Sequence, residues 1–227
     1  MKKINYLLLT LIFISATAMK TGMPAYNLFD KKGKEAKYKH LLKDAAQADV
    51  VLFGELHNNP IGHWLQLELT GSLYDEKDGN IVLGAEMFEA DNQLLLDEYT
   101  TGLIRERNFE NEAKLWNNYQ TDYKPLVEFA RAHNLKFVAT NIPRRYASMV
   151  HQQGFEALDS LPATAQAYIA PLPVLYDAEL PGYKGMLAMM GDMRHANDNL
   201  PKAQAIKDAT MANFILENLQ PGQTLIH

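Results

Sequence analysis

The sequence of 227 residues contains no cysteine. Without thiols the chain can form no structural disulfide, offers no thiolate to a metal ion and has no cysteine nucleophile. It also lacks the cysteine whose acylation tethers a bacterial lipoprotein, so we expect no lipid anchor of that kind.

Three other features that would identify a function class are missing. The chain has no glycine-rich phosphate loop and no Gly-x-Ser-x-Gly element, which argues against nucleotide binding and serine-hydrolase chemistry. Its net charge is -5 and no basic stripe is present, so nucleic-acid binding has no electrostatic basis.

Long hydrophobic runs are also absent, apart from one at the amino end. Residues 1–18 have the pattern of a signal peptide: Lys2 and Lys3, an apolar stretch over 7–14 interrupted by Thr10, and the small-x-small site Ala16-Thr17-Ala18. The apolar stretch is short for a membrane span. We therefore expect export, and a soluble mature region of residues 19–227 in the periplasm or outside the cell. A buried amino-terminal helix is the alternative.

Apolar runs separated by helical patterns predict an α/β fold. The runs cover residues 50–53, 81–85 and 136–140, and helical patterns cover 41–48, 63–73, 92–103 and 110–132, the last broken near Pro125. Such alternation favours a parallel sheet flanked by helices. Residues 26–34 predict a short strand and a turn. Residues 222–227 resemble the opening of a fourth strand, so we expect a further strand and helix beyond His227.

A smaller helical subdomain or lid is predicted at about residues 160–200. Prolines recur over residues 161–185, which favours a loop or lid over sheet. Four methionines then follow at the spacing of one helix face: Met186, Met189, Met190 and Met193. Methionine suits irregular apolar ligand surfaces, although such a stripe is also typical of an ordinary core.

Polar residues follow each predicted strand at its carboxyl side, which is the ligand-binding edge of an open parallel sheet. Glu55 and His57 follow the first run, Glu86 the second and Asn141 the third, while His227 ends the chain. We expect these side chains to share one cleft. The full set predicted for its rim is Glu55, His57, Asn58, His63, Glu86 and Asn141.

Three chemistries fit such a cleft. Glu55, His57 and Glu86 can act as general acid and base in a hydrolase. The same three can bind a divalent metal ion, although they do not form the His-Glu-x-x-His zinc signature. A flat anionic ligand is the third option: Arg144 and Arg145 would clamp its carboxylates, while the methionines, among them Met189, and nearby tyrosines cover its apolar faces.

Four segments, spread over about 160 residues, stand out together. They are Gly54-Glu55-Leu56-His57-Asn58-Asn59-Pro60 with His63, Gly84-Ala85-Glu86-Met87-Phe88-Glu89, Thr140-Asn141-Ile142-Pro143-Arg144, and the residues from Lys202 to Ala212. In sequence and in order they resemble the ChaN-like haem-binding uptake proteins, which belong with the Tiki proteases and erythromycin esterases in one superfamily.

The resemblance implies an exported protein of haem-iron acquisition that works with an outer-membrane haem-transport system. It also implies haem held between the subunits of a homodimer, with a tyrosine on each iron and a partner histidine at the propionates. Tyr176 and Tyr183 are the candidates for the tyrosine and His195 for the imidazole. Ferric haem does accept tyrosine as an axial ligand. A binding protein is favoured over an enzyme, and the rival hypothesis is an esterase or metal-dependent protease that uses Glu55, His57 and Glu86.

Overall fold

A computed structural model describes residues 24–190 and 199–227, which fall into two compact units, Met1–Leu41 and Leu42–His227. The described part of the first unit is a β-hairpin. Strands β1 (Leu28–Phe29) and β2 (Glu35–Ala36) pair antiparallel. Asp30 Oδ1 closes the turn by accepting the amides of Lys32 and Lys34, and Gly33 takes a φ of 75° there. The strand and turn predicted for residues 26–34 are confirmed. The division between the units falls within helix α2 (Tyr38–Ala46).

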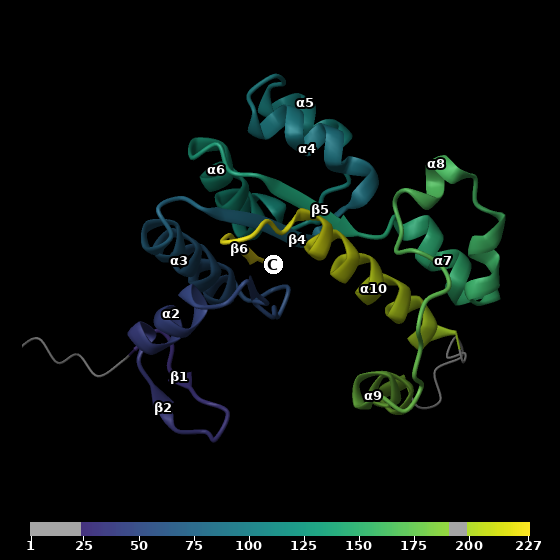
Figure 1. Ribbon diagram of the computed structural model, residues 1–227, viewed down its shortest axis with the longest axis horizontal. Helices are drawn as coiled ribbons and strands as arrows, with labels where there is room; N and C mark the ends of the chain where they lie inside the picture. The colour runs from purple at the N-terminus through teal and green to yellow at the C-terminus, as the bar shows by residue number, and fades with distance from the viewer. Residues whose placement is uncertain (1–23, 191–198) are drawn as a thin grey trace, which may run out of the picture. The chain divides into compact units, whose positions relative to one another are not determined.

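The second unit contains a parallel sheet of four strands in the order β3-β6-β4-β5 (Figure 1). Strand β3 is Val50–Val51, β6 is Thr224–Ile226, β4 is Ile81–Glu89 and β5 is Phe137–Asn141. All three pairings are parallel, with Val82 opposite Leu225 and Leu83 opposite both Ile226 and Phe137. The α/β class and the parallel sheet predicted from the sequence are confirmed.

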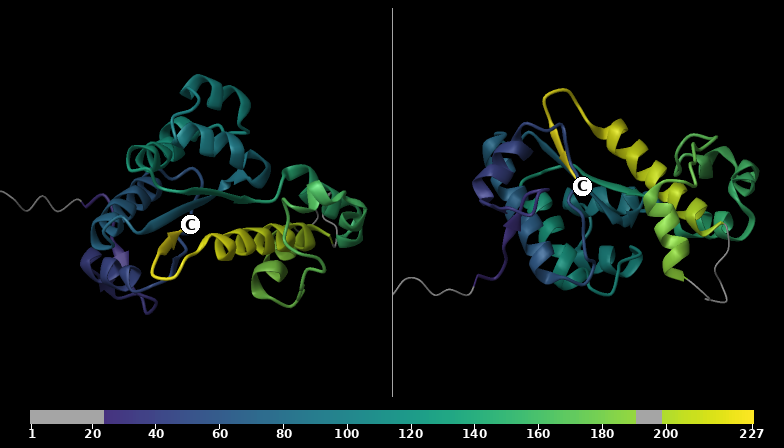
Figure 2. Two further views of the ribbon diagram at one scale, coloured as in Figure 1. Left: turned by 45° about the horizontal axis from the view of Figure 1, so that its top comes forward. Right: turned by 90° about the horizontal axis from the view of Figure 1, so that it is seen from below.

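Helices cover both faces of this sheet (Figure 2). Helix α10 (Leu200–Asn218) lies along one face, where Ile215 packs with Val82, Val138 and Leu225. On the other face lie α4 (Gln93–Thr100), α5 (Glu106–Glu112) and α6 (Lys124–Ala132). There, Phe88 and Phe109 belong to an aromatic cluster that reaches Phe137. The long helix α3 (Pro60–Glu76) follows β3 along the chain.

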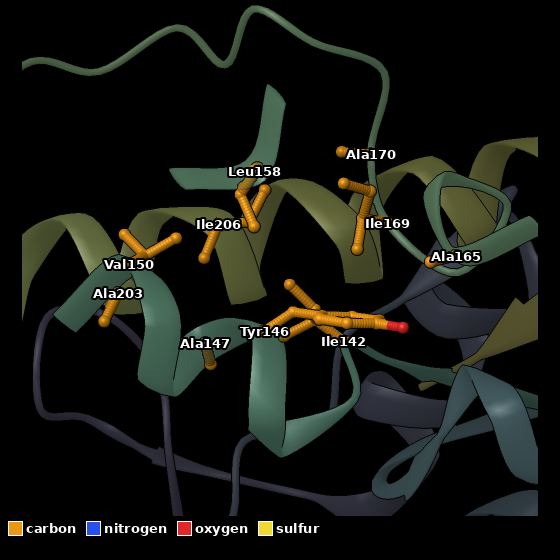
Figure 3. Close-up of a cluster of buried hydrophobic side chains, with 10 residues drawn as sticks. All are labelled: Ile142, Tyr146, Ala147, Val150, Leu158, Ala165, Ile169, Ala170, Ala203 and Ile206. Carbon is orange, nitrogen blue, oxygen red and sulfur yellow. The ribbon is translucent and has the colours of Figure 1, made fainter. Parts of the chain in front are cut away.

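A second hydrophobic cluster lies at the end of the sheet beyond β5 (Figure 3). It fills the space between α7 (Arg144–Gln153), α10 and the short helical segments Phe155–Ser160 and α8 (Ala163–Gln166). Tyr146, Val150, Leu158 and Ile206 are among its buried members. This cluster gives the helical elaboration a core of its own.

Several predicted boundaries are wrong. Strand β3 ends at Val51 and is half-buried, and Leu52 is 71% exposed; among the described strands, β3 lies at the sheet edge and pairs with β6 alone. Strand β4 continues to Glu89, so Glu86 lies within it rather than beyond it. The break in the helical stretch 110–132 falls after Glu112, whereas Pro125 lies in the first turn of α6, where its missing N–H costs no hydrogen bond.

The predicted lid is more helical than expected, because α9 (Pro181–Met190) already begins within the proline-containing segment. Met186, Met189 and Met190 lie on this helix, whereas Met193 lies outside the described residues, as do residues 1–18 and His195. In the described ranges, none of the helices combines the length and apolar character needed to cross a bilayer.

Candidate functional site

A cavity of about 410 Å³ opens at the carboxyl edge of the sheet. Its polar wall consists of Glu55, His57, Glu86, Asp208 and His227. Its apolar lining comes from the two residues after β3, from β4 and from one side of α10: Leu52, Phe53, Ala85, Met211, Ala212 and Ile215. Glu55, His57, Glu86 and His227 therefore line one cavity, as expected, although Glu86 lies within β4 rather than beyond its end.

Glu55 is the most connected of these groups. Its Oε2 accepts a hydrogen bond from the Tyr123 hydroxyl at 2.8 Å and lies 3.4 Å from His57 Nδ1. The Glu55 side chain is 17% exposed, whereas that of His57 is 51% exposed. Burial, followed by the hydrogen bond to Glu55, raises the pKa of Tyr123 well above its ordinary value. Tyr123 is therefore a protonated donor at neutral pH, and it fixes the orientation of the carboxylate.

His63 lies behind this pair rather than on the rim, where the sequence placed it. The imidazole is 5% exposed, packs edge-to-face on Tyr123 and lies with its Nε2 3.1 Å from the carbonyl oxygen of His57. Its Nδ1 lies 3.9 Å from Glu55 Oε1. The same His57 carbonyl accepts a hydrogen bond from Asn118 Nδ2 at 2.6 Å. His63 thus supports the backbone that presents His57.

The segment between Glu55 and His63 is shaped by the start of α3. Asn59 is the N-cap of that helix, and its Oδ1 accepts the amides of Ile61 and Gly62 at 3.0 and 3.2 Å. Pro60 follows in the first turn. Asn58, the other asparagine predicted for the rim, is exposed and does not line the cavity.

Glu86 lies where the pairing of β4 and β5 becomes irregular. Ala85 is opposite Ala139 and Glu89 is opposite Asn141, so β4 carries extra residues in between. Such bulges re-aim side chains beside functional sites. Asn141 Nδ2 donates to the Glu86 carbonyl at 3.0 Å, which fixes the irregular segment. Asn141 therefore lies beside Glu86, as expected, but not in the cavity wall.

His227 forms the floor of the cavity. Its Nε2 lies 2.7 Å from Thr140 Oγ1, and its backbone pairs with Val51 and Phe53. Burial lowers the pKa of His227, and the negative charge of Glu55 offsets this only in part. Gly84 permits this arrangement, because a Cβ at that position would approach both His227 Cδ2 and Thr140 Cγ2 to 3.2 Å.

Tyr183 is connected to the cavity through Asp208. The phenol of Tyr183, on α9, donates to Asp208 Oδ2 at 3.0 Å, and Asp208 lines the cavity from α10. Burial, together with this hydrogen bond, raises the pKa of Tyr183 to about 12. The ring of Tyr176 lies 5.5 Å from that of Tyr183 and 5.7 Å from that of Phe155.

The two arginines predicted to clamp an anionic ligand differ in their surroundings. Arg145 Nη1 binds Asp91 Oδ2 at 2.5 Å, and its guanidinium stacks over Tyr146 at 4.4 Å from the ring centroid. This guanidinium is already committed within the protein, so the prediction for Arg145 as a ligand clamp is not supported. Arg144 is 78% exposed and lies 3.8 Å from Glu89.

Sequence reasoning missed Tyr123, Asp208 and Thr140 as parts of the site. Tyr123 lies in a π-helical segment, Tyr119–Tyr123, a conformation often found at functional sites but without a sequence signature. Asp208 lies within one of the segments that carry the family resemblance, but no role was predicted for it. The divalent-metal interpretation gains no support, because in the ranges 24–190 and 199–227 no group of three or more histidine, aspartate or glutamate residues is arranged to hold a metal ion.

Comparisons with known proteins agree with this architecture. Residues 41–227 match the family described as "Haem-binding uptake, Tiki superfamily, ChaN". A solved structure titled "Cofacial heme binding to ChaN of Campylobacter jejuni" is similar in fold, with a TM-score of 0.64 and 18% sequence identity over 86% of this chain and 75% of that chain. No curated protein matches the sequence. The chain belongs to the ChaN family of haem-binding uptake proteins in the Tiki superfamily.

Proposed function

We propose that this protein binds haem for iron acquisition and that the cavity formed by Glu55, His57, Glu86 and His227 takes part in holding it. The observation that carries the proposal is the family match over residues 41–227. The solved ChaN structure of similar fold is described by its title as binding haem cofacially.

The cavity wall suits a flat, largely apolar ligand. Met211, Ala212 and Ile215 of α10 line it together with Leu52 and Phe53, and the side chains of Glu55, Glu86 and Asp208 are among its polar groups. Ligand pockets typically combine a mainly apolar lining with a few convergent polar groups. Leu52 and Leu56, on either side of Glu55 in the chain, are 71% and 76% exposed, which favours a ligand or a second subunit covering this edge.

Tyr183 is the better supported of the two proposed iron ligands. A phenol must lose its proton to bind ferric iron as a tyrosinate, and the Asp208 carboxylate is already the acceptor of that proton's hydrogen bond. Asp208 also lines the cavity, so Tyr183 is one hydrogen bond away from it. Tyr176 is the second candidate because its ring packs beside Tyr183. His195 remains a proposed imidazole from a second subunit.

Titration of the purified mature protein with hemin tests the proposal. Stoichiometric binding with a Soret shift is the expected result, and a spectrum unchanged from free hemin would overturn it. Tyr183→Phe and Tyr176→Phe, singly and together, then test the ligand assignment. Tyr74→Phe is the matched control, since Tyr74 packs against Phe129 and His133 away from the cavity. A spectrum that survives the double change would exclude both tyrosines.

The proposal also covers the export of the protein, its oligomeric state and its transport partner. Residues 1–18 direct export to the periplasm or beyond, which fractionation of cells expressing the full chain tests. The haem-bound form is a homodimer, which light scattering with and without hemin tests. The partner is an outer-membrane haem transporter, and this partnership is tested by measuring haem transfer between the two purified proteins.

Hydrolysis is the second candidate function, favoured by the Glu55–His57 pair at 3.4 Å with Tyr123 fixing the carboxylate. In this reading His57, as the more exposed member, takes a proton from water, while Glu55 and Glu86 stabilise the imidazolium. A panel of ester, lactone and peptide substrates, with and without divalent metal, tests it. Turnover that disappears in His57→Ala would support the hydrolase, and haem binding unaffected by that change would separate the two functions.

A further inference from the structure

Three hollows adjoin one another along the carboxyl edge of the sheet. The cavity already described shares Glu86 with a second, smaller hollow of about 80 Å³, which is also lined by Trp116 and Asn141. The second hollow shares Glu89 and Arg144 with a third of about 500 Å³. The depression therefore extends from β3, past the irregular part of β4, to the start of α7.

The charge along this depression changes sign. The first cavity has three carboxylates in its wall, those of Glu55, Glu86 and Asp208. The second and third hollows are together lined by four cations, Lys114, Arg144, Arg145 and Lys207, against two carboxylates, those of Glu86 and Glu89. Adjacent residues of α10, Lys207 and Asp208, thus lie at the basic and the acidic part respectively.

Among the described residues, two of these cations make close hydrogen bonds to carboxylates, whereas Arg144 and Lys207 make none. Lys114 donates to Glu89 at 3.0 Å and to Asp91 at 3.2 Å, and Arg145 is held by Asp91. Arg144 has its Nε 3.8 Å from Glu89, which is too far for a hydrogen bond. Lys207 is half-buried and forms no hydrogen bond or ion pair with any residue that the structure describes.

Asn141 supplies an independent sign that the second hollow accepts a ligand. Its Nδ2 is used by the Glu86 carbonyl, but its Oδ1 is buried without a partner in the described part of the chain. A buried acceptor of this kind is normally satisfied, commonly by an ordered water. A water that donates one hydrogen to Asn141 Oδ1 has a second to donate to a carboxylate held by the neighbouring cations.

We infer that Arg144 and Lys207 form a subsite for the carboxylate groups of the ligand. The inference rests on the proposed function, and it orients haem with its propionates toward α7 and its ring toward the cavity of Glu55 and His227. Arginine binds carboxylates through two parallel hydrogen bonds, and lysine adds a point charge. The opposite orientation would place two carboxylates against Glu55, Glu86 and Asp208, which like-charge repulsion disfavours.

Binding of hemin and of hemin dimethyl ester, which lacks the propionate charges, tests the subsite. The variants are Arg144→Ala, Lys207→Ala and the double change, with Arg107→Ala, an exposed arginine of α5, as the matched control. We expect the wild type to bind hemin at least about tenfold more tightly than the ester. Each single variant should lose about tenfold in hemin affinity, in line with a charge-assisted hydrogen bond, and little in ester affinity.

The outcomes separate this inference from the function on which it rests. A wild type that binds neither form of hemin would refute haem binding itself. A wild type that binds both equally, or variants with undiminished hemin affinity, would refute the subsite and leave haem binding standing. Far-UV circular dichroism identifies any variant that fails to fold. Arg144→Lys keeps the positive charge but not the paired N–H groups of the guanidinium, so it should lose less hemin affinity than Arg144→Ala.

Discussion

The hydroxyl of Tyr123 donates a hydrogen bond to Glu55 Oε2 at 2.8 Å, and this contact ties the helical layer to the loop that carries the predicted site. Tyr119, four residues earlier in the same π-helical segment, is equally buried, at 2% exposure against 3% for Tyr123. Its hydroxyl, by contrast, has no partner among the described residues. The two tyrosines therefore differ in whether the hydroxyl has a hydrogen-bond partner, and replacing each by phenylalanine tests the effect of that difference.

Tyr123→Phe should destabilise the fold, because it removes a hydrogen bond to a charged carboxylate. Such bonds contribute about 1.5–3 kcal/mol, so we expect a loss of that order in the free energy of unfolding measured with urea. The slope of the urea transition should not change. An unaltered midpoint would mean that Glu55 finds another partner.

Tyr119→Phe should change the free energy of unfolding in the opposite direction. It removes a buried hydroxyl that is left unsatisfied, so the variant should be as stable as the wild type or more stable by up to about 2 kcal/mol. The same urea experiment measures it, and each variant serves as the control for the other. A loss comparable to that of Tyr123→Phe would show that the Tyr119 hydroxyl has a bridging water in solution.

The sheet was predictable because its strands are apolar runs bounded by polar residues. Strand β5 differs from its predicted range by one residue at each end, as expected for a strand that is buried on both faces. Strand β3 was overextended because the apolar Leu52 and Phe53 continue the run of Val50 and Val51 beyond the point where the edge strand ends. Hydrophobicity marks a segment, but regular strand pairing covers only part of it: beyond Val51 a single backbone hydrogen bond among the described residues, from the Phe53 amide to the His227 carbonyl, continues the contact.

The site was predictable to the extent that parallel strands share an edge. This rule brings Glu55, His57, Glu86 and His227 together without any knowledge of side-chain packing. It says nothing of groups that come from helices, which is why Asp208 and Tyr123 were missed. It also cannot distinguish Arg144 from Arg145, since only the tertiary fold places Asp91 beside the second.

Asn59→Ala should loosen the segment that presents Glu55 and His57. The change removes the side chain that caps α3 by accepting two backbone amides. Loss of such a cap costs about 0.5–2 kcal/mol, whereas Asn59→Asp retains the acceptor and should stay close to the wild type. Urea unfolding measures the stability, and faster amide exchange at Ile61 and Gly62 would locate the effect. Equal losses in both variants would show that the cap is not the cause.

Gly84→Ala should destabilise the floor of the cavity. The added methyl group would lie 3.2 Å from both His227 Cδ2 and Thr140 Cγ2, and overpacking of this kind typically costs about 1–3 kcal/mol. Gly185→Ala is the matched control, because no atom of the described residues lies within 4 Å of a Cβ there and the residue is inside α9. The control should gain about 0.5–1 kcal/mol from the better helix propensity of alanine. Thermal unfolding should show a lower melting temperature for Gly84→Ala and a higher one for Gly185→Ala.

His227 should make the stability of the protein depend on pH. Its pKa in the folded protein is lowered by burial below the ordinary value of 6.5, so in acid the unfolded chain binds a proton that the folded chain does not. Titration of His227 therefore leaves the free energy of unfolding unchanged above about pH 6.5. Below that pH the free energy of unfolding falls, at a rate of at most about 1.4 kcal/mol per pH unit. His227→Gln keeps a side chain that can hydrogen-bond Thr140 but cannot titrate, so the difference in unfolding free energy between the two proteins should shift in favour of the variant as the pH falls. Parallel profiles from pH 7.5 to 5 would mean that His227 is protonated as readily in the folded state as in the unfolded chain, and the cavity floor would then be wetter than its contacts with Thr140 and Gly84 imply.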